Sequence, residues 1–160
     1  MLTIRRDLVD AMVAHARRDH PVEACGVLPG PAGSDRPERF VRMANVAGSK
    51  GFEELDPKDR YVFDSNADLR LYKELDDNGE ERVVIYHSHT HSEAYPSPTD
   101  ITRAWGYPDA HYVLVSTRDP DTHELRSYRI IDGEVSEEPI EVVESYMFSH
   151  TGADDVPDAH

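Results

Sequence analysis

The chain has 160 residues, of which 38% are hydrophobic and 31% charged, and its formal net charge is −15 at pH 7. This length fits one domain with a core of its own. The excess of acid argues against nucleic acid, whose phosphates need Lys and Arg, and against anionic membrane surfaces. No stretch approaches the roughly 18 apolar residues of a membrane span. The single cysteine, Cys25, excludes an internal disulfide, and Asp7 and Asp10 interrupt the N-terminal region, so a cytoplasmic protein is expected.

The first forty residues predict a strand, a helix and a second strand. Residues 2–4 begin a strand, and apolar residues then repeat at helical spacing until about residue 19. The helix is expected to stop at His20-Pro21, because a residue before proline is biased out of the helical region. Residues 23–28 form a short apolar run closed by Pro29-Gly30, which predicts a strand followed by a loop over 29–38.

The middle of the chain alternates short strands with a polar loop and a helix. Residues 40–46 and 61–63 are candidate strands, separated by a loop over 48–58. Apolar residues at helical spacing over 69–75 predict a helix, ended by a turn at 76–79. Residues 82–86 are short, apolar and β-branched, which is typical of a buried strand.

The last third is predicted to be mainly strands. Residues 110–116 are strongly apolar, and 124–131 alternate into Asp132-Gly133, a hairpin turn signal. We expect 134–146 to pair back on that strand and 149–160 to be a flexible C-terminal tail. Strands with helices inserted singly between them predict an α/β fold, with one domain over residues 1–148 built as a mixed β-sheet flanked by helices.

The most informative stretch is 87–100, which joins the strand over 82–86 to a polar turn and a helix start. His87 and His89 are expected to end the strand, where side chains at i and i+2 point to the same face and can converge on one ion. Asp100, eleven residues after His89, is positioned to supply a carboxylate as third ligand. Two His and one carboxylate leave an open position on zinc for water, as in hydrolytic sites.

Other interpretations of these histidines stay open. His87 and His89 alone are a weak motif and also fit two exposed histidines at a strand end. His91 raises a second alternative, in which three alternating histidines bind zinc together and Asp100 only caps a helix. Against it, the residues after His89 turn polar and soon reach Pro96, which suggests that the strand has already ended.

Ser97-Pro98-Thr99-Asp100 also has the pattern of a helix start. Ser at N-cap, Pro at N1 and an acid at N3 begin many helices. The two interpretations are compatible, because an N-cap fixes where the Asp100 carboxylate and the Ser97 hydroxyl point. A metal ligand and a hydrogen-bond donor to a transition state both need such fixed positions.

Glu23 stands before an apolar strand, where an acid is costly unless it is paired, hydrogen-bonded or used. The plain alternative is an exposed residue at the start of the strand. If that strand lies beside the one ending at His87, the Glu23 carboxylate would reach a zinc-bound water. Cys25, two residues on, is expected to be a small core residue, because nothing adjacent lowers its pKa.

Together these residues resemble the JAMM (MPN-plus) zinc metallopeptidases. The match consists of His87-x-His89, seven residues, Ser97-x-x-Asp100, and Glu23 within Pro21 to Gly30, and it extends from the first helix to about residue 146. The resemblance implies a cytidine-deaminase-like α/β fold with Zn²⁺ held by His87, His89 and Asp100. It also implies that Glu23 moves the water proton to the leaving amine and that Ser97 donates to the oxyanion. Much of the family has Pro after the second His, whereas this chain has Thr90 and His91.

A closer resemblance, over residues 86–90, 93–97 and 108–130, is to members of the family that act on ubiquitin-like sulfur-carrier proteins of the CysO type. It implies a carrier whose Gly-Gly tail bears cysteine in amide linkage, cleaved to release L-cysteine in cysteine biosynthesis. The alternatives are a general JAMM isopeptidase or peptidase on other ubiquitin-like tails, and a non-catalytic MPN scaffold. The loops over 29–38 and 48–58 are expected to contact the carrier or gate the site.

Overall fold

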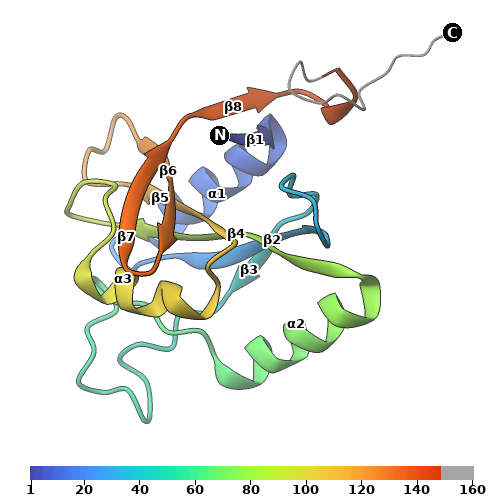
Figure 1. Cartoon of the computed structure of the whole chain (residues 1–160). Coiled ribbons are helices and arrows are strands. Elements are labelled where there is room, and N and C mark those ends of the chain that lie inside the picture. Colours follow the sequence, from blue (N-terminus) through green and yellow to red (C-terminus); the bar gives the residue numbers. More distant parts are fainter. Residues whose placement is uncertain (149–160) are drawn as a thin grey trace, which may run out of the picture.

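The computed structural model describes residues 1–148, so the tail expected over 149–160 lies outside the described residues. The elements are β1 (Leu2–Arg5), α1 (Arg6–Asp19), β2 (Cys25–Pro31), β3 (Val41–Met43), α2 (Ser65–Asn78), β4 (Glu80–His89), α3 (Pro98–Arg103), the 3₁₀ turn η1 (Ala104–Gly106), β5 (His111–Ser116), β6 (Glu124–Ile131), β7 (Glu134–Glu138), β8 (Ile140–Val143) and the 3₁₀ turn η2 (Tyr146–Phe148). The mixed α/β architecture predicted from the sequence is confirmed (Figure 1).

The main sheet has the strand order β3-β2-β4-β5-β6-β7, and β1 and β8 form a separate parallel pair. β4 runs parallel to β5, and the segment carrying α3 and η1 connects them; the other neighbours in the main sheet are antiparallel. β4 lies inside the sheet and is buried from Arg82 onward, which explains its continuous apolar run. Its last residues therefore emerge in the middle of the sheet edge, between β2 and β5.

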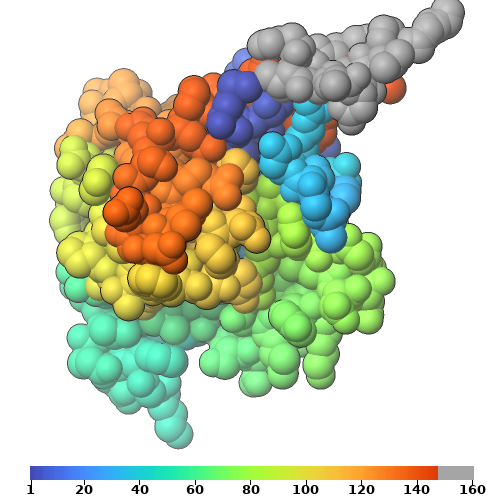
Figure 2. Space-filling model, in the orientation of Figure 1, coloured from blue at the N-terminus to red at the C-terminus, as the bar shows by residue number. Residues whose placement is uncertain are grey.

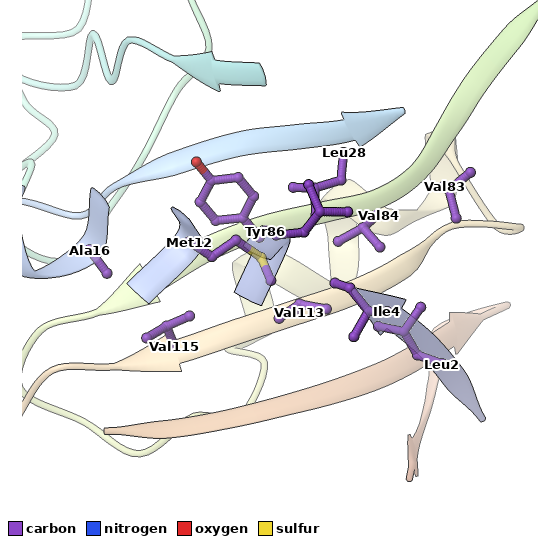
Figure 3. Close-up of a cluster of buried hydrophobic side chains, with 11 residues drawn as sticks. Leu2, Ile4, Met12, Ala16, Leu28, Val83, Val84, Tyr86, Val113 and Val115 are labelled. Atoms are coloured by element: carbon purple, nitrogen blue, oxygen red, sulfur yellow. The ribbon is translucent and has the colours of Figure 1, made fainter. Parts of the chain in front are cut away.

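Helices cover both faces of the sheet. On one face, α1 packs with β1 against apolar side chains of β4 and β5, and Figure 3 shows Met12 of α1 close to Tyr86, Val113 and Val115. On the other face, α2 packs on β2 through Leu71 and Leu75, while α3 and η1 pack on β4, β5 and β6. Figure 1 shows α1 and α2 on opposite sides of the strands. No helix among residues 1–148 is long and apolar enough to cross a membrane.

Two strand predictions in the first half of the chain are wrong. One strand ends later than predicted, and the other does not form. β2 does not close before Pro29 but continues through Gly30 to Pro31, after a register shift between Leu28 and Pro29. Proline is tolerated there because β2 pairs with β3 only from Cys25 to Val27, so the later residues have one neighbour. Residues 61–63 are not a strand, since they contribute a single bridge, from Phe63 to Asn45.

The end of the chain also departs from the prediction. The hairpin at Asp132-Gly133 is confirmed, with positive φ at both residues, but only β7 pairs with β6. β8 leaves the sheet and pairs in parallel with β1, for example Ile140 with Leu2. Pro139 separates the two strands and its carbonyl accepts a hydrogen bond from the Leu2 N–H, 2.9 Å. Because proline lacks an N–H, it ends the ladder at this position.

The helix predicted over 69–75 is longer at both ends. α2 begins at Ser65, where the Asp64 side chain accepts a hydrogen bond from the Ala67 N–H, and it includes the residues expected to form the terminal turn. Gly79, in the left-handed conformation with φ 67°, ends it. The turn signal at 76–79 is therefore a helix end rather than a separate turn.

Gly26 is required by the close packing of β2 on β4. A Cβ there would lie 2.5 Å from Tyr86 Cε1 and 2.6 Å from the Val41 carbonyl oxygen. Gly26→Ala is therefore expected to lower the free energy of unfolding by about 1–3 kcal/mol through overpacking. Gly106→Ala is the matched control, because no heavy atom lies within 4 Å of its added methyl. Equal urea midpoints for the two variants would contradict this account.

Candidate active site and metal centre

His87 and His89 are the last imidazoles of β4, and both are buried. Two residues apart on a strand, they project to the face that carries α3, opposite to Tyr86, which packs toward α1. Their Nε2 atoms lie 3.2 Å apart. The convergence predicted from the sequence is therefore present in the structure.

Asp100 reaches the same point from α3. Ser97 is the N-cap of this helix, and its hydroxyl accepts a hydrogen bond from the Asp100 N–H, 3.2 Å. In return, the Asp100 Oδ2 accepts from the Ser97 N–H at 2.8 Å, which completes a capping box. The same oxygen lies 3.2 Å from His87 Nε2 and 3.3 Å from His89 Nε2. The helix start and the carboxylate position are thus produced by one set of contacts.

These three side chains fit a divalent metal. Each offers one ligand atom, and these three atoms lie within 4.8 Å of one another. Among residues 1–148 no other group of three or more His, Cys, Asp and Glu side chains converges in this way. Tetrahedral zinc with ligands at about 2.0–2.1 Å separates its ligand atoms by about 3.3 Å, close to the distances given above. Two imidazoles and a carboxylate suit zinc, and three protein ligands leave one position for another group.

Neighbouring groups orient the candidate ligands. The Nδ1 of His89 lies 2.8 Å from the Glu93 carbonyl oxygen, so that nitrogen carries the proton and Nε2 presents its lone pair to the site. The ring of His87 packs on Tyr61, with ring centroids 4.6 Å apart. Each imidazole is therefore held in one orientation before any ligand binds.

Electrostatics also favour a cation at this point. Burial would raise the pKa of Asp100, but His87 and His89 outweigh it and hold the pKa of the carboxyl well below its usual range. Burial would lower the pKa of His89, but the contacts with Asp100 and the Glu93 carbonyl raise it. A carboxylate that stays ionised in a buried site attracts positive charge, which a metal ion supplies.

Glu23 lies beside this group, just before β2. Its N–H donates to the Pro57 carbonyl at 2.8 Å, and its own carbonyl accepts from Asn45 Nδ2 at 3.0 Å. Burial raises the pKa of Glu23 to about 7, although the neighbouring His87 and His89 act in the opposite direction. The carboxyl group is therefore poised to take up and release a proton near neutral pH.

Glu23, His89, Ser97 and Asp100 line one hollow of about 140 Å³. The Ser97 hydroxyl accepts from a backbone N–H, so its own proton remains available for another acceptor. A polar group entering the hollow would meet both a carboxyl group of raised pKa and a hydroxyl donor. This arrangement can support general acid–base chemistry on a metal-bound substrate.

His91 does not belong to the converging group in the described chain. β4 ends at His89, and His91 is exposed, with its Nδ1 3.1 Å from the Thr90 hydroxyl. The arrangement with three histidine ligands therefore has no geometric support. Cys25 is fully buried, its thiol lies 3.6 Å from the Met43 carbonyl oxygen, and burial raises its pKa to about 12, in agreement with the predicted core role.

Three residues that contact the site were not identified from the sequence. Asn45 bridges the backbones of Glu23 and Arg60 with its amide N–H groups, and its Oδ1 accepts from Ala47 and Val62. Tyr61 packs on His87, and Arg103 donates to the Tyr61 carbonyl. The isolated apolar triplet at 61–63 is the sequence signal for Tyr61, although this pattern predicts a strand and not a residue that packs on a metal ligand.

Of the two loops expected to serve the site, the one over 48–58 borders it. Its end is tied to the site by the Pro57 contact with Glu23 and by a hydrogen bond from the Thr90 hydroxyl to the Lys58 carbonyl, 2.9 Å. In Figure 2 this segment protrudes in turquoise at the lower left. Residues 32–38 follow the end of β2 that pairs with Glu80, at the opposite end of β4 and roughly 20 Å from His87.

Comparison with known proteins identifies relatives over most of the chain. A family model of prokaryotic homologs of the JAB domain matches residues 5–131. A protein of Mycobacterium tuberculosis named CysO-cysteine peptidase is 61% identical over 146 residues, covering 91% of this chain and 94% of the relative. The Desampylase of Haloferax volcanii is 32% identical over 119 residues, covering 72% of this chain and 80% of the relative.

Solved structures agree on the fold. DSY2949 from Desulfitobacterium hafniense has a TM-score of 0.73 and 30% identity, covering 91% of this chain and 94% of that one. AF2198 from Archaeoglobus fulgidus, a JAB1/MPN domain protein, has a TM-score of 0.56 at 20% identity, covering 89% of this chain and 99% of that one. The expected JAMM/MPN fold is therefore confirmed.

The raised pKa of Glu23 makes the stability of the metal-free protein depend on pH. The folded protein retains a proton up to about pH 7, whereas the unfolded chain releases it near 4.5, so rising pH favours unfolding across this interval. Glu23→Gln removes this dependence, and relative to wild type it is expected to gain up to about 3 kcal/mol of unfolding free energy between pH 5 and pH 8. Urea unfolding in the presence of a chelator measures the difference.

Glu54→Gln is the control for that measurement, because Glu54 is an exposed carboxylate within the 48–58 loop that borders the site. It should leave the pH dependence of wild type unchanged. Parallel curves for wild type and Glu23→Gln would show that Glu23 titrates like an exposed acid and would contradict the assignment.

Proposed function

The chain belongs to the family of prokaryotic homologs of the JAB domain, and from this we propose that it is a zinc-dependent peptidase acting on a ubiquitin-like sulfur-carrier protein. The bond cleaved is the amide between the C-terminal glycine of the carrier and cysteine, and the product is L-cysteine. The single observation that carries the proposal is the convergence of His87, His89 and Asp100 beside Glu23 and Ser97. The name of the Mycobacterium tuberculosis relative, CysO-cysteine peptidase, supports a substrate of this class.

His87, His89 and Asp100 would hold the zinc ion. When bound, zinc acts as a Lewis acid that lowers the pKa of water from about 15.7 toward 7 and polarises a scissile carbonyl. The capping box keeps the Asp100 carboxylate in place, and the Glu93 carbonyl keeps the His89 ring in the orientation that presents Nε2. These contacts reduce the reorganisation needed when the substrate enters.

Glu23 is proposed to move the proton. Its Oε atoms accept a proton from the attacking water and return it to the nitrogen of the leaving cysteine amine. In the metal-free protein burial raises the pKa of Glu23 to about 7, and a bound zinc ion would lower it, which favours the carboxylate that accepts the water proton. Its backbone is fixed by Pro57 and Asn45, which limits the positions that the carboxyl group explores.

Ser97 is proposed to stabilise the oxyanion. Its position is set by the first turn of α3, and its hydroxyl proton is free to point into the hollow. Donors of this kind contribute on the order of 3 kcal/mol to transition-state stabilisation. A Gly-Gly tail has no side chains to exclude from a hollow of this size and can lie extended next to the 48–58 loop.

The proposal includes a cytoplasmic role in cysteine biosynthesis and one catalytic domain over residues 1–148. A second candidate is a peptidase or isopeptidase acting on other ubiquitin-like tails, which the Desampylase relationship favours. A non-catalytic scaffold is the least supported alternative, since a scaffold would not need Glu23 to be buried beside the histidines.

Substitutions separate the proposed roles. His87→Ala and Asp100→Ala should lose zinc and activity together, because each removes a ligand. Glu23→Ala should retain zinc and lose turnover by about 10²–10⁴-fold, the range for a proton-transfer group. His91→Ala is the control histidine and should retain zinc. Metal content by mass spectrometry would contradict the ligand set if His91→Ala lost zinc while Asp100→Ala kept it.

The reaction itself is tested by intact-mass spectrometry of a carrier–cysteine conjugate incubated with the zinc-loaded protein. We expect the conjugate to lose the mass of one cysteine residue with wild type and to stay intact with Glu23→Ala. An intact conjugate in the presence of wild type with zinc bound would reject this substrate. Cleavage of a carrier–lysine isopeptide conjugate under the same conditions would then favour the second candidate.

A further inference from the structure

We propose that the hollow beside the candidate metal ligands contains a subsite for a free α-carboxylate, with the Arg103 guanidinium as its anchor. The inference rests on the proposed function and narrows it to leaving groups that are single amino acids. When the amide between glycine and cysteine is cleaved, the α-carboxylate of cysteine is one carbon away from the leaving nitrogen. A negative charge must therefore be accommodated next to the reacting amide.

The hollow is unfavourable for that charge unless a cation is present. Glu23, Asp59 and Asp100 all line it, and the chain as a whole has a net charge of −15. Carboxylates brought together in a partly buried site repel one another. Among the described residues that line the hollow, the Lys and Arg side chains are Arg60 and Arg103. Apart from the zinc ion proposed above, the positive charge that side chains could offer a leaving carboxylate comes from these two arginines.

Arg103 is held in place for such a contact. It ends α3, three residues after Asp100, and residues at this spacing lie on the same side of a helix. Its Nη1 donates to the Tyr61 carbonyl, and its guanidinium carbon lies 4.9 Å from the centroid of the Tyr61 ring. A guanidinium carries five N–H donors, so donors remain for a carboxylate, which it binds best in bidentate geometry.

Arg60 is less suited to the role. Its Nη1 donates to the Asp59 carbonyl at 2.9 Å and lies 3.8 Å from the Asp59 carboxylate. That acid already balances its charge. Arg103 has no comparable carboxylate partner among the ion pairs of residues 1–148. The two arginines therefore form a natural test pair, one proposed as anchor and one as control.

The subsite determines which conjugates are good substrates. A hollow of about 140 Å³ is small compared with the roughly 300–1,000 Å³ of drug-sized ligand sites, which suits a reacting amide and one small residue. A single amino acid places its carboxylate within this volume, beside Arg103. In an isopeptide to a lysine of a larger protein, the leaving nitrogen bears a methylene chain with no carboxylate at that distance. The chain is therefore expected to favour release of one amino acid over separation of two proteins.

Two carrier conjugates that differ by one charge test this subsite. One ends in cysteine with its free carboxylate, and the other ends in cysteinamide, which has the same thiol and no charge. For the zinc-loaded wild type we expect kcat/KM to be about tenfold higher for the free acid, as for the loss of one charge-assisted bidentate contact. Arg103→Gln should remove this preference, measured as the ratio of kcat/KM for the two conjugates, because it slows the free acid more than it slows the cysteinamide conjugate.

Three controls make the outcome specific. Arg60→Gln should keep the preference for the free acid. Arg103→Lys should show part of the preference that Arg103→Gln loses, because the positive charge remains while the bidentate geometry of the guanidinium is lost. Binding of both conjugates to Glu23→Ala, measured by calorimetry, should show the same preference in Kd, and the added Arg103→Gln substitution should abolish it. Equal wild-type rates on both conjugates, or an equal loss on both with Arg103→Gln, would overturn the subsite. Cleavage of neither conjugate by wild type would instead reject the proposed function.

Discussion

The structure of the site depends on the antiparallel pairing of β2 with β4. This ladder places Cys25 opposite His87, so Glu23 comes to the end of β4 that carries both imidazoles. Ser88 strengthens the junction, because its N–H donates to the Ala24 carbonyl at 2.9 Å and its hydroxyl accepts from the Ala24 N–H at 2.8 Å. A one-residue slip would turn the histidines to the α1 face. Gly26 permits this register, since any side chain there would collide with Tyr86.

The capping box of α3 is the second constraint, and it links local structure to electrostatics. Ordinary helix-start chemistry fixes Ser97 and Asp100, and the same carboxylate oxygen faces both histidines. The N-terminal turn of α3 must therefore both begin a helix and present a candidate metal ligand. Because the helix is only six residues long, Arg103 at its other end is positioned by the same segment. Changes in the cap would move all three side chains together.

Local patterns predicted much of this arrangement, and long-range contacts account for the rest. His87 and His89 follow from strand periodicity, and Asp100 follows from the cap signature. The placement of Glu23 was conditional on β2 lying beside β4, because periodicity gives strands but not their neighbours. The same reason explains the error at β8, whose partner β1 lies at the other end of the chain. Asn45 and Arg103 act through backbone carbonyls of distant segments, which no spacing in the sequence encodes.

Two carboxyl groups of the site are driven in opposite directions by their surroundings. Asp100 contacts both imidazoles and two groups of its own cap, so its negative charge is compensated and its pKa falls. Glu23 is buried with less compensation, so its pKa rises toward neutrality. When the pKa values of two neighbouring carboxyl groups are moved apart in this way, one group stays ionised and the other can carry a proton. Burial acts to raise the pKa of both carboxyl groups, so the division arises from the contacts that each group makes within the same polar hollow.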